Sequence, residues 1–172
     1  NDWWRNNRDA GRPSVIIAYS LGKAQRILAG VDASIGPIYV HHTVHAMNEA
    51  YRETGIDLPS NIIPLKTGQL PPPESLIVTP RNTLQSRWLG KLGTAQLAFA
   101  SGWMLMRKGR DRRSLNKGFV LSDHADWPQL LEAIAATEAE YILCTHGSEE
   151  TVIEYLRSKG QRADSLTVLA AK

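Results

Sequence analysis

Two histidines stand directly after two short apolar runs, and their types and spacing suit chemistry better than any other pair in the chain. His124 comes just after the run 118–122, in the sequence SDHAD. His146 comes directly after the run 140–145, in the sequence CTHG. If both runs are parallel strands joined by a right-handed helical crossover, the strands are neighbours about 4.8 Å apart. Loops at the carboxyl ends of such strands carry rigidly held side chains. We therefore expect both imidazoles to face one site.

Two carboxylates flank the first histidine. Asp123 and Asp126 could orient the ring of His124 or set its tautomer, as carboxylates do for catalytic and ligand histidines. The structural alternative is that Asp126 only caps the helix that follows it. Two histidines with two carboxylates favour a functional pair, with His124 and Asp126 as catalytic candidates. These residues do not complete a zinc site, because a catalytic zinc usually takes three protein ligands.

Apolar runs alternate with helical patterns along much of the chain, and this predicts an α/β fold with a mostly parallel sheet and helices on both faces. The apolar runs lie at 14–19, 37–40, 75–79, 95–101, 118–122, 140–145 and 165–170. The helical patterns lie at 21–30, 43–55, 126–137 and 148–160. A proline-rich connection covers 67–75, and we find no internal repeat.

The composition limits the class of protein. The chain has 172 residues, 42% of them apolar and 22% charged, which is typical of a folded globular protein rather than a disordered one. No run approaches the roughly 18–20 apolar residues of a membrane span, and no signal peptide opens the chain. The single cysteine, Cys144, excludes an internal disulfide. These features predict a cytoplasmic protein with no membrane partner, and the first residue, Asn1 instead of Met, suggests a piece of a larger one.

Basic residues concentrate in one segment. The formal net charge is only +3, but the segment 107–117 carries six cations against one aspartate, a local charge of +5. Such a run can follow a phosphate backbone, and the alternative is an ordinary solvated loop. The candidate nucleic-acid contacts in this segment are Arg107, Lys108, Arg110, Arg112 and Arg113.

A second candidate anion site lies at the turn SLGKAQR. Lys23 and Arg26 stand where a strand is expected to turn into a helix, and backbone N–H groups at a helix start favour anions. The turn lacks the pattern of a P-loop, and a tight turn explains Gly22 without any ligand. Lys23 and Arg26 are therefore weaker candidates for phosphate contacts than the basic segment.

Two further patterns favour structural roles. His42 and His45 stand three apart, but no carboxylate or cysteine nearby completes a metal site, and Thr43 is expected to cap a helix there. The five tryptophans follow no regular spacing and are expected to pack in the core or between domains. They are Trp3, Trp4, Trp88, Trp103 and Trp127.

Four motifs together resemble one branch of a known superfamily. YSLGKAQRIL (19–28), FASGW (99–103), GFVLSDHADW (118–127) and THG (145–147) occur in the order seen in the β-CASP branch of the metallo-β-lactamase superfamily. The chain is most similar to the carboxyl-terminal half of the ligase-associated DNA exonucleases, also known as messenger RNA 3′-end processing factor-like exonucleases. The resemblance covers nearly the whole chain.

The resemblance implies a function and a division of the chain. Residues 1–117 would form a β-CASP-like cassette, and 118–172 would return to a metallo-β-lactamase-like core. The protein would be part of a zinc-dependent nuclease, with two zinc ions in the complete enzyme, acting on single-stranded DNA or RNA beside ligase-linked repair proteins. His146 would be a zinc ligand and His124 would assist the leaving group.

The superfamily's hallmark His-x-His-x-Asp-His motif does not occur in these 172 residues. In the family this motif belongs to the amino-terminal half, so we expect the chain alone to bind no zinc and to be inactive. The alternative is a stand-alone module that binds nucleotides or nucleic acid without catalysis. The missing metal ligands and the LGK turn favour that alternative.

Overall fold

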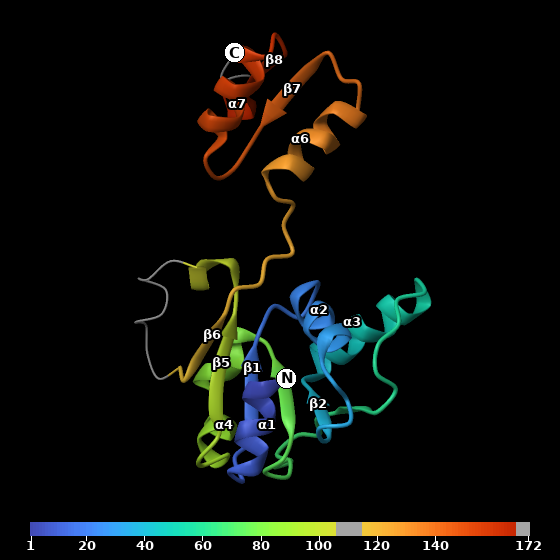
Figure 1. Ribbon diagram of the computed structural model, residues 1–172, viewed down its shortest axis with the longest axis vertical. Helices are drawn as coiled ribbons and strands as arrows, with labels where there is room; N and C mark the ends of the chain where they lie inside the picture. The colour runs from blue at the N-terminus through green and yellow to red at the C-terminus, as the bar shows by residue number, and fades with distance from the viewer. Residues whose placement is uncertain (106–114, 168–172) are drawn as a thin grey trace. The chain divides into compact units, whose positions relative to one another are not determined.

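The structure, a computed structural model, describes residues 1–105 and 115–167, and it divides into two compact units (Figure 1). The first unit is Asn1–Asp123 and the second is His124–Lys172. The first unit holds a six-stranded parallel sheet in the order β3-β2-β4-β1-β5-β6, and the second holds the parallel pair β7-β8. The predicted α/β class with a parallel sheet is confirmed.

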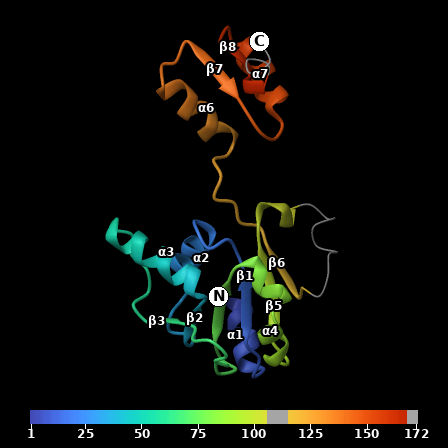
Figure 2. The same cartoon turned by 180° about the vertical axis from the view of Figure 1, so that it is seen from behind.

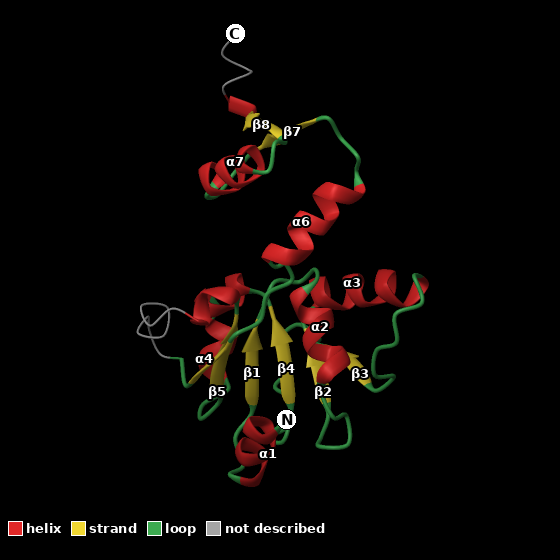
Figure 3. Cartoon of the chain, turned by 45° about the horizontal axis from the view of Figure 1, so that its top comes forward, coloured by secondary structure: helices red, strands yellow, loops and turns green. Residues whose placement is uncertain are grey.

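The strands of the first sheet are short and start at one common end of the sheet. They are β1 (Ser14–Ile17), β2 (Ile38–Val40), β3 (Ile62–Pro64), β4 (Leu76–Thr79), β5 (Gln96–Ala100) and β6 (Lys117–Phe119). The helices of this unit are α1 (Asp2–Asp9), α2 (Lys23–Gly30), α3 (His42–Glu53) and α4 (Arg87–Lys91), with 3₁₀ turns η1 (Arg81–Gln85) and η2 (Gly102–Leu105). Figure 3 shows the strand arrows pointing the same way, with α1 at the end where the strands begin.

The central strands β1 and β4 are buried at every position because helices cover both faces of the sheet. In β1, Val15 and Ile17 pack into one cluster, whereas Ile16 packs into another on the opposite face. Burying each of these side chains contributes roughly 1.5–3 kcal/mol before conformational entropy is subtracted. The apolar runs of the sequence predicted β1 and β4 for this reason.

The two faces are covered by different helices. Trp4 of α1, Leu28 of α2 and Val44 of α3 join the cluster around Ile16. Trp88 and its neighbours in α4 pack against the cluster around Val15 and Ile17. Helices α2 and α3 lie side by side, as both Figure 1 and Figure 2 show.

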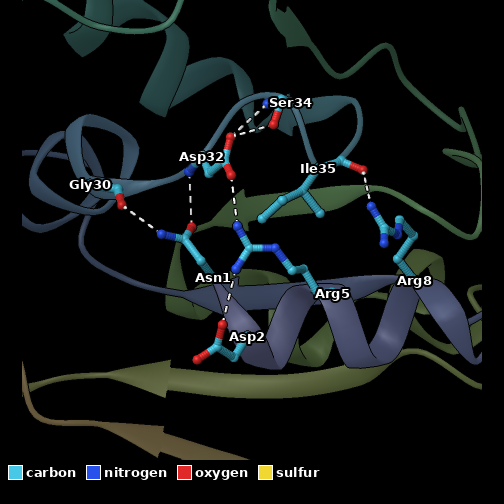
Figure 4. Close-up of polar contacts among 8 residues, drawn as sticks. All are labelled: Asn1, Asp2, Arg5, Arg8, Gly30, Asp32, Ser34 and Ile35. Carbon is cyan, nitrogen blue, oxygen red and sulfur yellow. Dashed lines mark hydrogen bonds and ion pairs between the residues drawn. The ribbon is translucent and has the colours of Figure 1, made fainter.

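Helix α1 is tied to the loop between α2 and β2 by polar contacts (Figure 4). The guanidinium of Arg5 donates to Asp32 Oδ2 at 2.7 Å, and Arg8 Nη1 donates to the carbonyl of Ile35 at 3.1 Å. The side chain of Asn1 accepts from the N–H of Asp32 at 2.9 Å and donates to the carbonyl of Gly30 at 3.3 Å. These contacts fix the first helix against the amino end of β2.

The second unit contains α6 (Trp127–Ala136), β7 (Tyr141–Cys144), α7 (Glu149–Ser158) and β8 (Arg162–Ser165). Its core gathers around Ile153, Leu156 and Ala163. The strand expected at 165–170 is wrong in its described part: β8 ends at Ser165, opposite the end of β7 at Cys144, and residues 166–167 are helical. Residues 168–170 lie outside the described residues.

The strands before His124 and His146 belong to different units, so their expected pairing stays a prediction. β6 pairs with β5 inside the six-stranded sheet, and β7 pairs with β8 in the separate two-stranded sheet. Phe119 of β6 packs on the core cluster of the first unit, so β6 is held there by tertiary contacts. The division of the chain follows Asp123, which places 118–123 with the first unit.

Across the described residues, none of the helices has both the length and the apolar character that crossing a membrane requires.

Candidate functional site

Polar side chains collect where the parallel strands of the first sheet end. Lys23 follows β1, His41 follows β2, Asn82 follows β4 and Asp123 follows β6. In open parallel sheets this carboxyl edge is where ligands bind, because the loops there carry side chains on a rigid support. We therefore take the carboxyl edge of the six-stranded sheet as the first candidate region.

A buried ion pair joins two of these loops. Lys23 is a residue only 4% exposed, and its ammonium contacts the carboxylate of Asp123 and lies 4.8 Å from the centre of the Tyr19 ring. Gly22 has a φ of +79°, and a Cβ at this position would lie 2.7 Å from Asp123 Oδ2. Glycine is required there both for its backbone conformation and for the close approach of the carboxylate. We call the Lys23–Asp123 pair the clamp.

The second cation of the turn also contacts the segment after β6. Arg26 donates through Nη1 to the carbonyl oxygen of Ser122. Lys23 and Arg26, predicted as phosphate contacts, thus both have protein partners, and their contact with phosphate stays a prediction. Helix α2 begins as expected at this turn, with the N–H of Gly22 donating to Gln25 Oε1 at 2.8 Å.

A chain of hydrogen bonds connects the loops after β1 and β2. Gln25 Nε2 donates to Asn48 Oδ1 at 2.8 Å and to the carbonyl of Ser20 at 3.0 Å. The hydroxyls of Ser20 and Thr43 are 2.8 Å apart, and Thr43 Oγ1 lies 2.8 Å from His41 Nδ1. These contacts hold the His41 ring in one orientation.

His41 caps α3, so the expected cap at Thr43 is wrong. The N–H of Thr43 donates to His41 Nδ1 at 3.3 Å, which requires that nitrogen to be unprotonated. Burial lowers the pKa of His41 from its usual value of 6.5, and the nearby His42 lowers it further. The centres of the two imidazole rings are 4.0 Å apart. His41 is therefore neutral near pH 7.

A cleft of about 320 Å³ opens at the carboxyl ends of β2, β3 and β4. We call it the carboxyl-edge cleft. Its lining comes from three connections: the start of α3, the loop after β3, and the segment from η1 to α4. The lining residues are His41, His42, Leu65, Lys66, Thr67, Gly68, Asn82, Thr83, Ser86 and Trp88.

The predicted catalytic residues of the second unit lie around the start of α6. Asp126 caps this helix: its Oδ1 accepts from the N–H of Gln129 at 3.0 Å, and its own N–H donates to Gln129 Oε1 at 3.1 Å. This is the structural role that the sequence left open for Asp126. His124 is exposed and lies two residues before this cap.

His146 has an unusual backbone conformation at the end of β7. Its φ is +66°, and Gly147 follows with a φ of +71°. Few residues other than glycine adopt this conformation, and it often marks a functional site. His146 Nδ1 lies 3.0 Å from Thr145 Oγ1, and within the described chain Nε2 has no hydrogen-bond partner. The side chain is exposed.

Among residues 1–105 and 115–167, no three His, Cys, Asp or Glu side chains lie close enough to share a metal ion. This holds around His146 and around the pair His42 and His45. The basic candidates Arg107, Lys108, Arg110, Arg112 and Arg113 lie outside the described residues.

Sequence reasoning missed most of the carboxyl-edge cleft. Lys66 and Asn82 belong to loops with no recognisable motif, and Trp88 was assigned to packing. The one available signal was position, since Lys66 and Asn82 each lie just after the end of a parallel strand.

Comparison with known proteins gives one distant similarity. The chain is 28% identical over 156 residues to a protein of Opitutus terrae described as a probable DNA ligase. The aligned region covers 90% of this chain and 15% of that protein, so the chain spans a small part of the relative. No family model matches the sequence.

Proposed function

We propose that this chain is the carboxyl-terminal part of a zinc-dependent nuclease that hydrolyses phosphodiester bonds of DNA. In this proposal His146 supplies one zinc ligand and His124 supplies a proton to the leaving oxygen. The observation that carries the proposal is the geometry of His146. Its Nδ1 contacts the hydroxyl of Thr145, and its Nε2 faces no protein partner among the described residues.

This geometry matches that of a metal-ligating histidine. Such histidines usually bind the metal through one ring nitrogen and donate the other N–H to an oxygen, which fixes the tautomer and orientation of the ring. Thr145 Oγ1 can accept that N–H. The left-handed backbone of His146 and Gly147 adds a second feature that ordinary packing does not explain.

The described residues do not by themselves fit a catalytic zinc. Such a zinc usually takes three protein ligands, and no group of three candidate side chains occurs in the described part of the chain. The proposal therefore requires further ligands from residues outside this chain, and it assigns to this chain His146 alone.

The similarity to a probable DNA ligase favours DNA over RNA as the substrate. An enzyme that trims DNA ends and one that joins them act on the same strands, and the four motifs resemble exonucleases associated with ligases. The basic segment 107–113 would hold the negatively charged strand, as runs of Lys and Arg do.

The two histidines can be separated by substitution in the full-length protein. His146→Ala removes a zinc ligand, so bound zinc and nuclease activity should fall together and recover partly with excess zinc. His124→Ala should keep the zinc content and lose activity by about 10²–10⁴, the usual contribution of a general acid. That loss should shrink on a substrate whose leaving group is already acidic. Atomic emission and turnover on both substrates measure these effects.

Loss of zinc in His124→Ala, or an equal loss on both substrates, would show that His124 is not the acid. A full-length protein that binds DNA but carries no zinc and hydrolyses nothing would support the alternative, a binding module without catalysis.

A further inference from the structure

We propose that the carboxyl-edge cleft binds a single nucleotide, with its phosphate beside His42 and Lys66 and its base against Trp88. This inference rests on the proposed function, because it names one part of the substrate that the first unit recognises. The cleft lies wholly within the first unit, whose loops after β2, β3 and β4 supply all of its lining.

The size of the cleft suits a small ligand. At about 320 Å³ it lies at the lower end of the roughly 300–1,000 Å³ that small-molecule sites occupy. The lining combines the polar groups of His42 and Lys66 with the apolar ring of Trp88, so a ligand with one charged end and one flat apolar end can contact both. A nucleotide has this division, whereas an inorganic anion would leave the apolar wall unused.

The charge of the lining favours an anion. No carboxylate lines the cleft, and Lys66 is an exposed ammonium. His42 is also exposed and is the first residue of α3, a helix whose amino end carries a partial positive charge. A phosphate here would meet a cation, an imidazole ring and a helix amino terminus.

The indole of Trp88 forms a rigid apolar wall. Its Nε1 donates to the carbonyl of Gln69 at 2.7 Å, and its ring packs on the core cluster that contains Leu92. Both contacts hold the ring in place before any ligand arrives, so stacking a base on it requires little ordering. Stacking on an aromatic side chain adds to affinity for every base, because every base has a flat π face.

Asn82 supplies a group that can bind the edge of a base. Its side chain is exposed at the rim of the cleft, and within the described residues its amide makes no hydrogen bond. An amide offers both a donor and an acceptor, so it can pair with any base. The cleft therefore combines a site for phosphate, a stacking surface and an adaptable polar group.

The test is an NMR titration of this chain with deoxyadenosine 5′-monophosphate, with deoxyadenosine and with inorganic phosphate. We expect the nucleotide to shift the amides of His42, Lys66, Gly68 and Asn82 and the indole N–H of Trp88. Deoxyadenosine and phosphate should each bind at least about tenfold more weakly, because each loses one of the two contacts.

Substitutions then assign the contacts. Lys66→Ala should weaken nucleotide binding about fivefold to tenfold through loss of one charge-assisted contact. Lys91→Ala is the matched control, because Lys91 is an exposed lysine of the same unit outside the cleft. Trp88→Phe keeps an aromatic ring in the core and should weaken the nucleotide more than it weakens inorganic phosphate.

Three results would overturn the inference: no shifts at millimolar nucleotide, equal weakening by Lys66→Ala and Lys91→Ala, or phosphate binding as tightly as the nucleotide. These measurements need neither zinc nor catalysis. The proposed nucleotide binding can therefore be disproved while the zinc-ligand role of His146 is supported. Equally, the nuclease proposal can be disproved while the cleft is shown to bind nucleotide.

Discussion

The two ends of the six-stranded sheet use their charged residues differently. At the amino end, Arg5 pairs with both Asp2 and Asp32, so these charges neutralise one another and anchor α1 (Figure 4). At the carboxyl end, the clamp joins two loops, and the cleft beside β2, β3 and β4 is lined by imidazoles, an ammonium and an amide without any carboxylate. The charges at the amino end stabilise the fold. The carboxyl end instead carries polar side chains that, in our proposal, contact a ligand.

The burial of the ion pairs differs as well. The side chains of Arg5 and Asp32 are 41% and 38% exposed, whereas those of Lys23 and Asp123 are 5% and 29% exposed. Exposed pairs contribute about 0–1 kcal/mol, but removing one partner of a buried pair costs about 3–5 kcal/mol because the other charge stays out of water. The comparison therefore predicts unequal effects at the two ends.

The largest effect is expected at the clamp. Asp123→Ala removes the carboxylate that faces the buried ammonium of Lys23, and we expect the free energy of unfolding to fall by about 3 kcal/mol. Urea unfolding, combined with hydrogen exchange of the amides of β1, measures this loss in the first unit. The double variant Lys23→Met, Asp123→Ala should recover part of it, because methionine fills the space without a buried charge.

An unchanged stability of Asp123→Ala would mean that the clamp contributes no more than a surface pair. Equal stabilities of the single and double variants would show that the loss does not come from the buried ammonium.

A smaller effect is expected from the titration of His41. Burial lowers its pKa in the folded chain below 6.5, so the unfolded chain takes up the proton first as the pH falls. Stability should therefore decrease as the pH drops from above 6.5 through the lowered pKa. His41→Asn keeps a capping acceptor for the N–H of Thr43 but does not titrate, so its stability should change less over this range. Thermal unfolding of both proteins between pH 7.5 and pH 5 measures the difference, and parallel curves would contradict the assignment.

The sequence predicted the central sheet well because its signal is local. The continuous apolar residues of β1 and β4 reflect burial on both faces, and Gly22 with Asp126 marked the starts of α2 and α6. β3 gave no such signal, because it is a three-residue edge strand that ends in Pro64.

Features that depend on contacts between distant segments could not be predicted from local sequence patterns. The spacing of β6, α6 and β7 does not show that Phe119 packs on the core of the first unit or that β7 pairs with β8. The carboxyl-edge cleft joins three loops that no motif connects. Trp88 packs in the core as expected and lines the cleft with the same ring, so a correct structural role did not exclude a role at a site.

The smallest effect is expected at the amino end. Asp32 accepts hydrogen bonds from the hydroxyl and the N–H of Ser34 and forms an ion pair with Arg5. The hydrogen bonds from Ser34, and to a smaller extent the contact with Arg5, lower the pKa of Asp32 below 3.8. Its contribution to stability is therefore present above pH 3.8 and is lost as the pH falls through the lowered pKa. Asp32→Asn should lower the melting temperature slightly at pH 7, by less than Asp123→Ala does, and the difference from the unmodified chain should shrink in acid.

Asp57→Asn is the matched control for this variant, because Asp57 is exposed and makes no hydrogen bond or ion pair within the described residues. Nucleotide binding should be unchanged in both variants, since neither residue lines the cleft. If Asp32→Asn destabilised the chain as much as Asp123→Ala, or weakened nucleotide binding, the division between a structural end and a ligand-binding end of the sheet would be wrong. If its effect matched that of Asp57→Asn, the contacts of Asp32 would hold α1 in place without adding to stability.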